Sequence, residues 1–76
     1  MTDPNALPMW TVFERPADFP YEFVARKWLV VRGETQLTSD MVHGDSLEAV
    51  RHQLPAGLYR MPRKPGDAPN IIETWF

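Results

Sequence analysis

The stretch YEFVARKWLVVR, residues 21–32, decides the fold because it is the longest strand candidate in the chain. Valine and aromatic residues favour strands, and successive strand side chains point to opposite faces of a sheet. The two faces would be Phe23, Ala25, Lys27, Leu29, Val31 and Val24, Arg26, Trp28, Val30, Arg32. A strand with one solvated face alternates apolar and polar residues, whereas both faces here are mainly apolar. We therefore predict a central strand, or one whose second face meets another surface.

The stretch RPADFP, residues 15–20, leads into this strand. Pro16 and Pro20 lack a backbone N–H and push the residues before them toward extended geometry. Asp18 is a typical turn residue because its carboxylate can bond to its own downstream backbone. We interpret this stretch as a stiff connection, with a first strand before it in MWTVFE, residues 9–14. Residues 1–8 contain two prolines and are predicted to form a flexible arm, leaving 9–76 as one small domain.

One helix is predicted, in DSLEAVRHQLP, residues 45–55. Asp45 can act as the N-cap, and Glu48 stands three positions later, as in a capping box. The apolar residues recur at helical spacing, as Leu47, Val50 and Leu54. A helix this short is not stable alone in water, so it should pack on the sheet.

The other segments predict further extended structure. Residues 34–45 are polar and irregular, with at most a brief extended piece at Met41 and Val42. Residues 57–62 and 70–76 are expected to pair as a hairpin around a type II turn at Pro65–Gly66, with 70–76 as a candidate edge strand. The order strand–strand–helix–strand–strand predicts an α+β fold. It would be a small, mainly antiparallel sheet of about four strands with one short helix on one face.

Composition excludes several classes of protein. A chain of 76 residues is one domain, and it has no cysteine for disulfides or thiolate metal sites. The formal net charge of −2 argues against nucleic-acid binding by bulk charge. No apolar run is long enough to span a membrane, and the first residues do not form a signal peptide. We predict a cytoplasmic protein that gains stability from a partner subunit, since so small a core gives limited stability.

Two stretches together resemble a group of short, uncharacterised bacterial proteins of unknown function. They are WTVFERPADFPYEFVARKW, residues 10–28, and SLEAVRHQLPAGLYRMPRKPGDAPNIIETWF, residues 46–76. The shared features are an aromatic–Pro–Asp–aromatic–Pro start, a Phe-Val-Ala-Arg strand, a Ser-Leu-Glu helix start and a hydrophobic last strand. The resemblance implies a free-standing bacterial protein, and it implies no activity, cofactor or site residue.

Catalytic chemistry has little support in the sequence. His43, Asp45 and His52 are the only group in which metal ligands or an acid–base pair could meet. Asp45 is already needed as the cap, and His52 lies off the apolar stripe of the helix. There is no nucleophile elbow and no phosphate-binding glycine loop. We therefore predict a protein that is not an enzyme, with no catalytic residue, cofactor or metal.

Protein–protein contact is the predicted function. One short helix covers only part of a sheet, so an aromatic-rich face or an edge strand should stay open for another protein or a second copy, as a homodimer. The candidate interface residues are Trp10, Trp28, Val30, Ile72 and Trp75.

The alternative is binding of single-stranded nucleic acid. Aromatic residues on a sheet, flanked by basic residues, stack and clamp unpaired bases. The residues that would do so are Arg26, Lys27, Trp28, Arg32 and Arg60.

Overall fold

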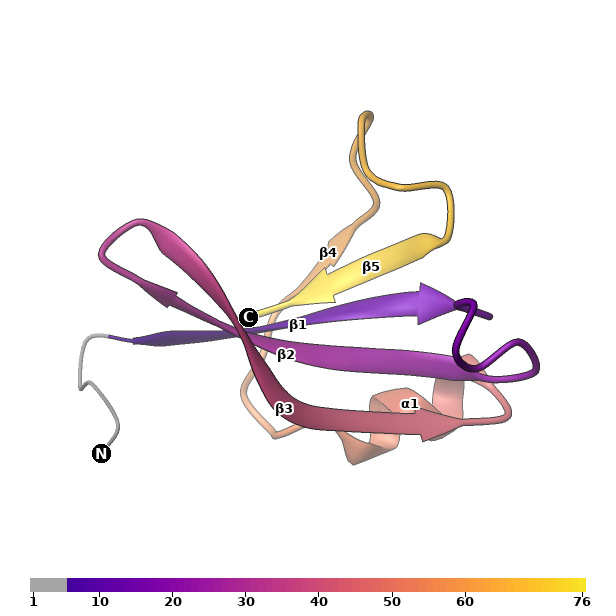
Figure 1. Ribbon diagram of the computed structural model, residues 1–76. Coiled ribbons are helices and arrows are strands. Elements are labelled where there is room, and N and C mark those ends of the chain that lie inside the picture. The colour runs from indigo at the N-terminus through magenta and orange to yellow at the C-terminus, as the bar shows by residue number, and fades with distance from the viewer. Residues whose placement is uncertain (1–5) are drawn as a thin grey trace.

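Five antiparallel strands form a single sheet, and a short helix packs on one of its faces (Figure 1). The computed structural model describes residues 6–76. The elements are β1 (Leu7–Glu14), β2 (Phe23–Val31), β3 (Glu34–Gly44), α1 (Leu47–Gln53), β4 (Arg60–Pro62) and β5 (Ile71–Trp75). The strand order across the sheet is β3-β2-β1-β5-β4. The predicted α+β class, antiparallel sheet and single helix are confirmed, with five strands in place of about four.

Strand β3 is the main correction, because a brief extended piece at Met41 and Val42 was expected there. The strand runs over 11 residues. It begins after a two-residue turn in which Arg32 and Gly33 both have positive φ, 51° and 79°. That is the geometry of a type I′ hairpin turn, whose twist matches that of the paired strands. The polar sequence suits β3 because an edge strand buries little side-chain surface.

A bulge interrupts the pairing of β3 with β2 between Arg26 and Trp28. The Thr38 hydroxyl donates to the carbonyl of Lys27 at 2.9 Å and accepts the N–H of Asp40 at 3.1 Å. A side chain thus replaces part of the lost backbone ladder. Bulges of this kind protect sheet edges from indiscriminate pairing.

Strand β5 lies inside the sheet, so the expectation that residues 70–76 form an edge is wrong. It pairs with β1 on one side, with Trp10 opposite Trp75, and with β4 on the other. The edge is instead β4, which is shorter than the strand predicted over 57–62. Of the arm predicted over 1–8, residues 1–5 lie outside the described part, and Leu7 and Pro8 belong to β1.

Helix α1 begins one residue later than predicted. Its N-cap is Ser46, whose side chain accepts the N–H of Ala49 at 3.1 Å, so Asp45 is not the cap. Ser46 has extended backbone geometry, which is the conformation from which a serine oxygen reaches the third helical N–H. The predicted apolar stripe is confirmed: Val50 is fully buried, and Leu47 and Leu54 pack against the core. No helix in residues 6–76 is long and apolar enough to span a bilayer.

The core lies between α1 and one face of the sheet. Residues paired directly across antiparallel strands point to the same face. One row on the helix side is Val42, Ala25, Val12 and Glu73, and the next is Trp10, Trp75 and Arg60, with Lys27 opposite Trp10. The buried cluster is built from Trp10, Val12, Ala25 and Val50. We call the opposite side of the sheet the open face.

The connection over residues 15–22 covers one end of the open face. Pro16 is buried, and the ring of Phe19 stacks on His43 with centroids 5.3 Å apart. The carboxylate of Asp18 accepts a hydrogen bond from Arg26. Beneath this cover, Val24 is fully buried on the face that α1 does not touch. The second face of β2 is therefore closed at this end by its own connection, and open beyond it.

Candidate interaction surface

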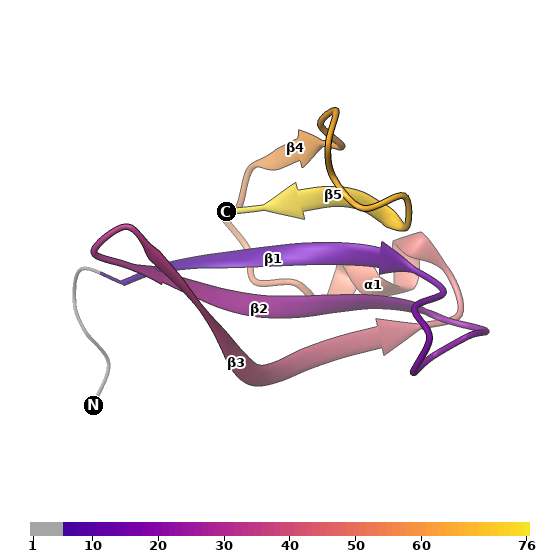
Figure 2. The ribbon, with the colours of Figure 1, turned by 45° about the horizontal axis from the view of Figure 1, so that its top comes forward.

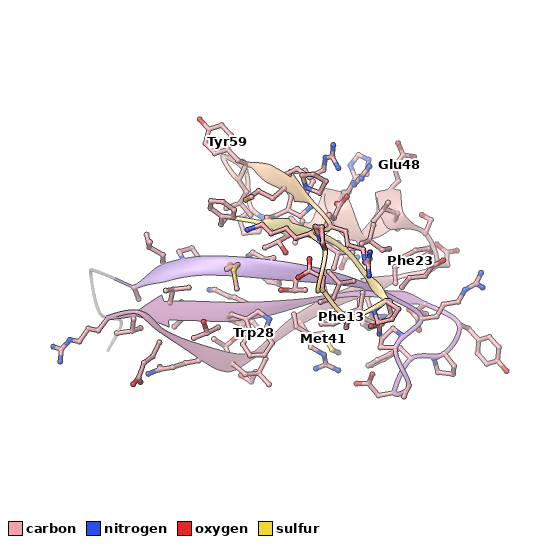
Figure 3. The ribbon with its side chains drawn as sticks, turned by 90° about the horizontal axis from the view of Figure 1, so that it is seen from above. Phe13, Phe23, Trp28, Met41, Glu48 and Tyr59 are labelled. Carbon is pink, nitrogen blue, oxygen red and sulfur yellow. The ribbon has the colours of Figure 1, made fainter. Side chains whose placement is uncertain are left out.

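The uncovered part of the open face carries two neighbouring rows of apolar side chains. In one row Trp28 lies between Leu37 and Met9, and in the other Val30 pairs with Leu7. Figure 3 shows Trp28 pointing away from the side of the sheet that carries α1. Leu7 is 65% exposed and Leu37 is 56% exposed. We call Leu7, Met9, Trp28, Val30 and Leu37 the apolar patch.

The apolar patch contains no charged side chain. The next row of the open face is polar in its centre. There Arg26 of β2 pairs with Thr11 of β1, which on its other side pairs with Thr74 of β5. Arg26 is neutralised by Asp18. Methionines stand at both ends of this row, at Met41 and Met61. A surface that covered the patch would therefore meet apolar atoms without stripping water from an unpaired charge.

A groove of about 340 Å³ adjoins the apolar patch on the side of β5 and β4. It is lined by Met9, Thr11, Met61, Pro62, Lys64, Asp67, Ile71, Thr74 and Phe76. One wall is the β4–β5 loop, where the N–H of Asp67 donates to the carbonyl of Lys64 at 3.1 Å and Gly66 has a φ of 94°. These features fit the predicted type II turn at Pro65–Gly66.

The five predicted interface residues fall on different parts of the sheet. Trp28 and Val30 belong to the apolar patch. Trp10 and Trp75 face each other on the helix side, where Trp10 is only 6% exposed. Ile72 packs against the core next to a register shift in the β1–β5 pairing. An interface on the open face would thus use two of the five predicted residues. The other members of the apolar patch, Leu7, Met9 and Leu37, were not predicted from the sequence. Leu37 was missed because its segment reads as a loop.

The five predicted nucleic-acid contacts are also separated. Arg26 and Trp28 lie on the open face, whereas Lys27 and Arg60 share a row on the helix side. Arg32 stands in the turn between β2 and β3. Lys27 Nζ lies 3.7 Å from Asp40 Oδ2, and Arg60 Nη1 lies 3.7 Å from Glu73 Oε1. The single basic and aromatic face expected for base stacking does not form, and nucleic-acid binding stays a prediction.

A buried carboxylate on the helix side was not predicted from the sequence. Glu73, on β5, is only 1% exposed. Arg51 of α1 donates from Nε to Oε2 at 2.9 Å and from Nη2 to Oε1 at 2.6 Å. Trp75 donates from Nε1 to Oε2 at 2.6 Å. The signal in the sequence is the acid inside the apolar strand IIETW, directly opposite Val12 in the structure. The pair of Arg51 and Glu73 fixes α1 to the sheet.

Two effects compete to set the charge of Glu73. Burial acts to raise the pKa of this carboxyl, but the hydrogen bonds from Arg51 and Trp75 and the charges of Arg51 and Arg60 outweigh it. The pKa of Glu73 is therefore below its ordinary value of 4.5. The hydrogen bond to Glu73 also raises the pKa of Arg51, despite partial burial. Both groups are ionised at neutral pH, and the buried charge is compensated.

Acidification should weaken the ion pair of Arg51 and Glu73 and so lower the stability of the fold. A carboxyl whose pKa is lower in the folded protein stabilises it fully above the ordinary value, and that stability is lost as pH falls through the folded pKa. We expect the free energy of unfolding, from urea titrations, to fall as pH drops below about 4.5. The slope of this free energy against pH should be shallower in Glu73→Gln. Glu14→Gln removes an exposed carboxylate and is the matched control. Equal slopes in all three proteins would contradict this assignment.

The two histidines have different surroundings. His43 Nδ1 lies 2.7 Å from Glu22 Oε2, and the ring stacks on Phe19. His52 is exposed on α1. Across residues 6–76, no three acidic or histidine side chains converge as metal ligands would.

Comparisons of the chain with protein-family models, curated proteins and solved structures found no match, so the resemblance to short bacterial proteins stays a prediction.

Proposed function

We propose that this protein acts by protein–protein contact through the apolar patch, and that its partner is a second copy of the same chain. The observation that carries the proposal is the pair of uncharged apolar rows around Trp28. The connection over residues 15–22 covers one end of the open face and leaves these two rows uncovered. Exposed apolar patches rimmed by polar residues are typical of interaction sites.

The small core supports association with a partner. In the described part of the chain, five apolar side chains are buried: Trp10, Val12, Val24, Ala25 and Val50. Domains of this size bury a smaller fraction of their surface on folding than larger domains do, and they often gain stability from oligomerisation. Covering Leu7 and Leu37, each more than half exposed, would remove apolar surface from water in every subunit.

The charge distribution favours a second copy as the partner. In a two-fold dimer, residues near the axis meet their own counterparts, so a charge there would face a like charge. The apolar patch has no charge, and Arg26 in the neighbouring row is already paired with Asp18. Two copies can therefore meet through this patch without repulsion at its centre.

Leu37→Asp tests this proposal. The side chain is more than half exposed, so the substitution should leave the fold intact, as circular dichroism can verify. We expect wild-type protein to have twice the chain mass in light scattering at about 100 µM, and Leu37→Asp to raise the dissociation constant at least about tenfold. The physical reason is that each dimer would bury two unpaired carboxylates.

Tyr21→Asp is the matched control. Tyr21 is 88% exposed and lies in the connection over 15–22, outside the apolar patch. Tyr21→Asp likewise introduces a carboxylate at an exposed site, and it should leave the mass measured by light scattering unchanged. A wild-type protein that is monomeric at that concentration would remove the self-association claim. Equal weakening by both variants would remove the assignment to this face.

A further inference from the structure

The groove of about 340 Å³ on the open face has polar groups on two sides. The sheet contributes Thr11 of β1 and Thr74 of β5, which stand directly opposite each other. The β4–β5 loop contributes Lys64 and Asp67. Figure 2 shows the β4–β5 hairpin beside β1, with its loop near the end of that strand. Two hydroxyls and two charged groups therefore border the same space.

Apolar side chains make up the rest of the lining. They are Met9, Met61, Pro62, Ile71 and Phe76. Methionine is flexible and polarisable, so it adapts to the shape of an inserted group. The volume lies at the lower end of the range of ligand sites, about 300–1,000 Å³. A groove of this size and lining suits a small molecule with an apolar part.

The two charged groups of the loop have opposite signs and do not compensate each other. Within residues 6–76, neither Lys64 nor Asp67 forms an ion pair. The Asp67 carboxylate accepts the backbone N–H of Lys64 through Oδ2 at 2.9 Å, so Oδ1 stays available to a ligand. A ligand with a single charge would be attracted by one of the two side chains and repelled by the other. A zwitterion complements both.

Hydrogen bonds hold the loop that carries these charges. The N–H of Asp67 donates to the carbonyl of Lys64 at 3.1 Å. Arg63 donates from Nη2 to the carbonyl of Asp67 at 3.0 Å, and the N–H of Ile71 donates to the carbonyl of Ala68 at 3.0 Å. The backbone at both charged residues is therefore placed before a ligand arrives, which lowers the cost of binding.

We propose that the groove binds a free α-amino acid with an apolar side chain. Lys64 pairs with its carboxylate, Asp67 accepts a hydrogen bond from its ammonium group, and its side chain lies against the apolar lining. The hydroxyls of Thr11 and Thr74 can each donate or accept a hydrogen bond to the same polar groups. The lining belongs to one chain, so this site goes beyond the proposed self-association and does not depend on it.

Three probes with the same aromatic ring separate the two charges of the ligand. L-phenylalanine carries both charges, 3-phenylpropionate lacks the ammonium group, and 2-phenylethylamine lacks the carboxylate. In NMR titrations of ¹⁵N-labelled protein, we expect L-phenylalanine to shift the amide signals of Thr11, Thr74 and Asp67. Each analogue should bind about fivefold more weakly or worse, because one ion pair is lost. The expected factor is modest because Lys64 is exposed.

Two variants assign each charge to its side chain. Lys64→Met and Asp67→Asn should each weaken L-phenylalanine binding about fivefold. Asparagine keeps an oxygen that accepts the N–H of Lys64, so the turn should be preserved. Lys64→Met should not weaken 2-phenylethylamine, and Asp67→Asn should not weaken 3-phenylpropionate, which a merely structural effect would not reproduce. Glu14→Gln, at an exposed site outside the groove, should leave all three affinities unchanged.

Two outcomes would overturn the proposal. One is the absence of amide shifts at the groove with L-phenylalanine at about 10 mM. The other is equal affinity for the three probes, which would show that the charges of the loop do not select the ligand. Light scattering of the same samples reports self-association separately, so failure of this site and failure of the proposed function are distinguishable.

Discussion

Replacing Arg51 by methionine is expected to lower the free energy of unfolding by about 2–3 kcal/mol. The change leaves the carboxylate of Glu73, 1% exposed, without the guanidinium that binds both of its oxygens. Only Trp75 and the more distant Arg60 would still compensate the buried charge. The expected loss is moderate for a buried pair because Arg51 is itself partly exposed. Urea denaturation followed by tryptophan fluorescence gives the measurement.

Two further variants separate charge compensation from simple packing. Arg60→Met removes only the contact at 3.7 Å from Glu73, so it should cost less than about 1 kcal/mol. The double variant Arg51→Met with Glu73→Met removes both charges and should recover most of the loss. If the double variant is as unstable as Arg51→Met, the cost arises from lost packing, and the ion pair is not its cause.

Replacing Trp10 by alanine should lower the free energy of unfolding further than the loss of Arg51, by about 3–5 kcal/mol. Trp10 is 6% exposed and belongs to the cluster with Val12, Ala25 and Val50. Removing its rings leaves a cavity under α1, and a small domain has little stability in reserve. Thermal unfolding followed by circular dichroism should show little folded protein at room temperature.

Two substitutions provide the controls for Trp10→Ala. Trp10→Phe keeps most of the volume, and it loses no hydrogen bond because the Trp10 indole N–H has no acceptor in the described residues. It should cost clearly less. Trp28→Ala removes a partly exposed ring from the apolar patch, so it should lower the affinity of the proposed dimer more than the stability of the single chain. If Trp10→Ala and Trp28→Ala affected both properties alike, the division between core and patch would be wrong.

The tryptophans also show what local sequence can predict. The period of two within β2 placed Trp28 and Val30 on one face correctly. It could not place Trp10, Trp28 and Trp75 relative to one another, because that depends on pairing between distant strands. Trp10 stands opposite Lys27 and Trp75, and only this register puts it on the side of α1. Strand register is set by the whole sheet, whereas alternation is a local property.

The missed strand β3 has a different cause. β3 is an edge strand that contributes little to the core, and its residues are mostly polar. The alternation of apolar and polar residues that would predict a strand is therefore absent. The remaining signal was the Arg32–Gly33 pair, in which glycine suits a positive φ but arginine gives no such indication. Glu73 was missed for a similar reason. A carboxylate in a strand is usually solvated, and its burial follows only once Arg51 is known to lie above it.

The pairing of β1 with β5 has a consequence for folding. β1, β2 and β3 follow one another in the chain, so each pairing among them closes a short connection. The contact between Trp10 and Trp75 instead joins residues near opposite ends of the described chain. Contacts so distant in sequence form slowly, because a long loop must close first. Until then β1 presents a free apolar edge, so a newly made chain is most exposed to aggregation before β5 docks.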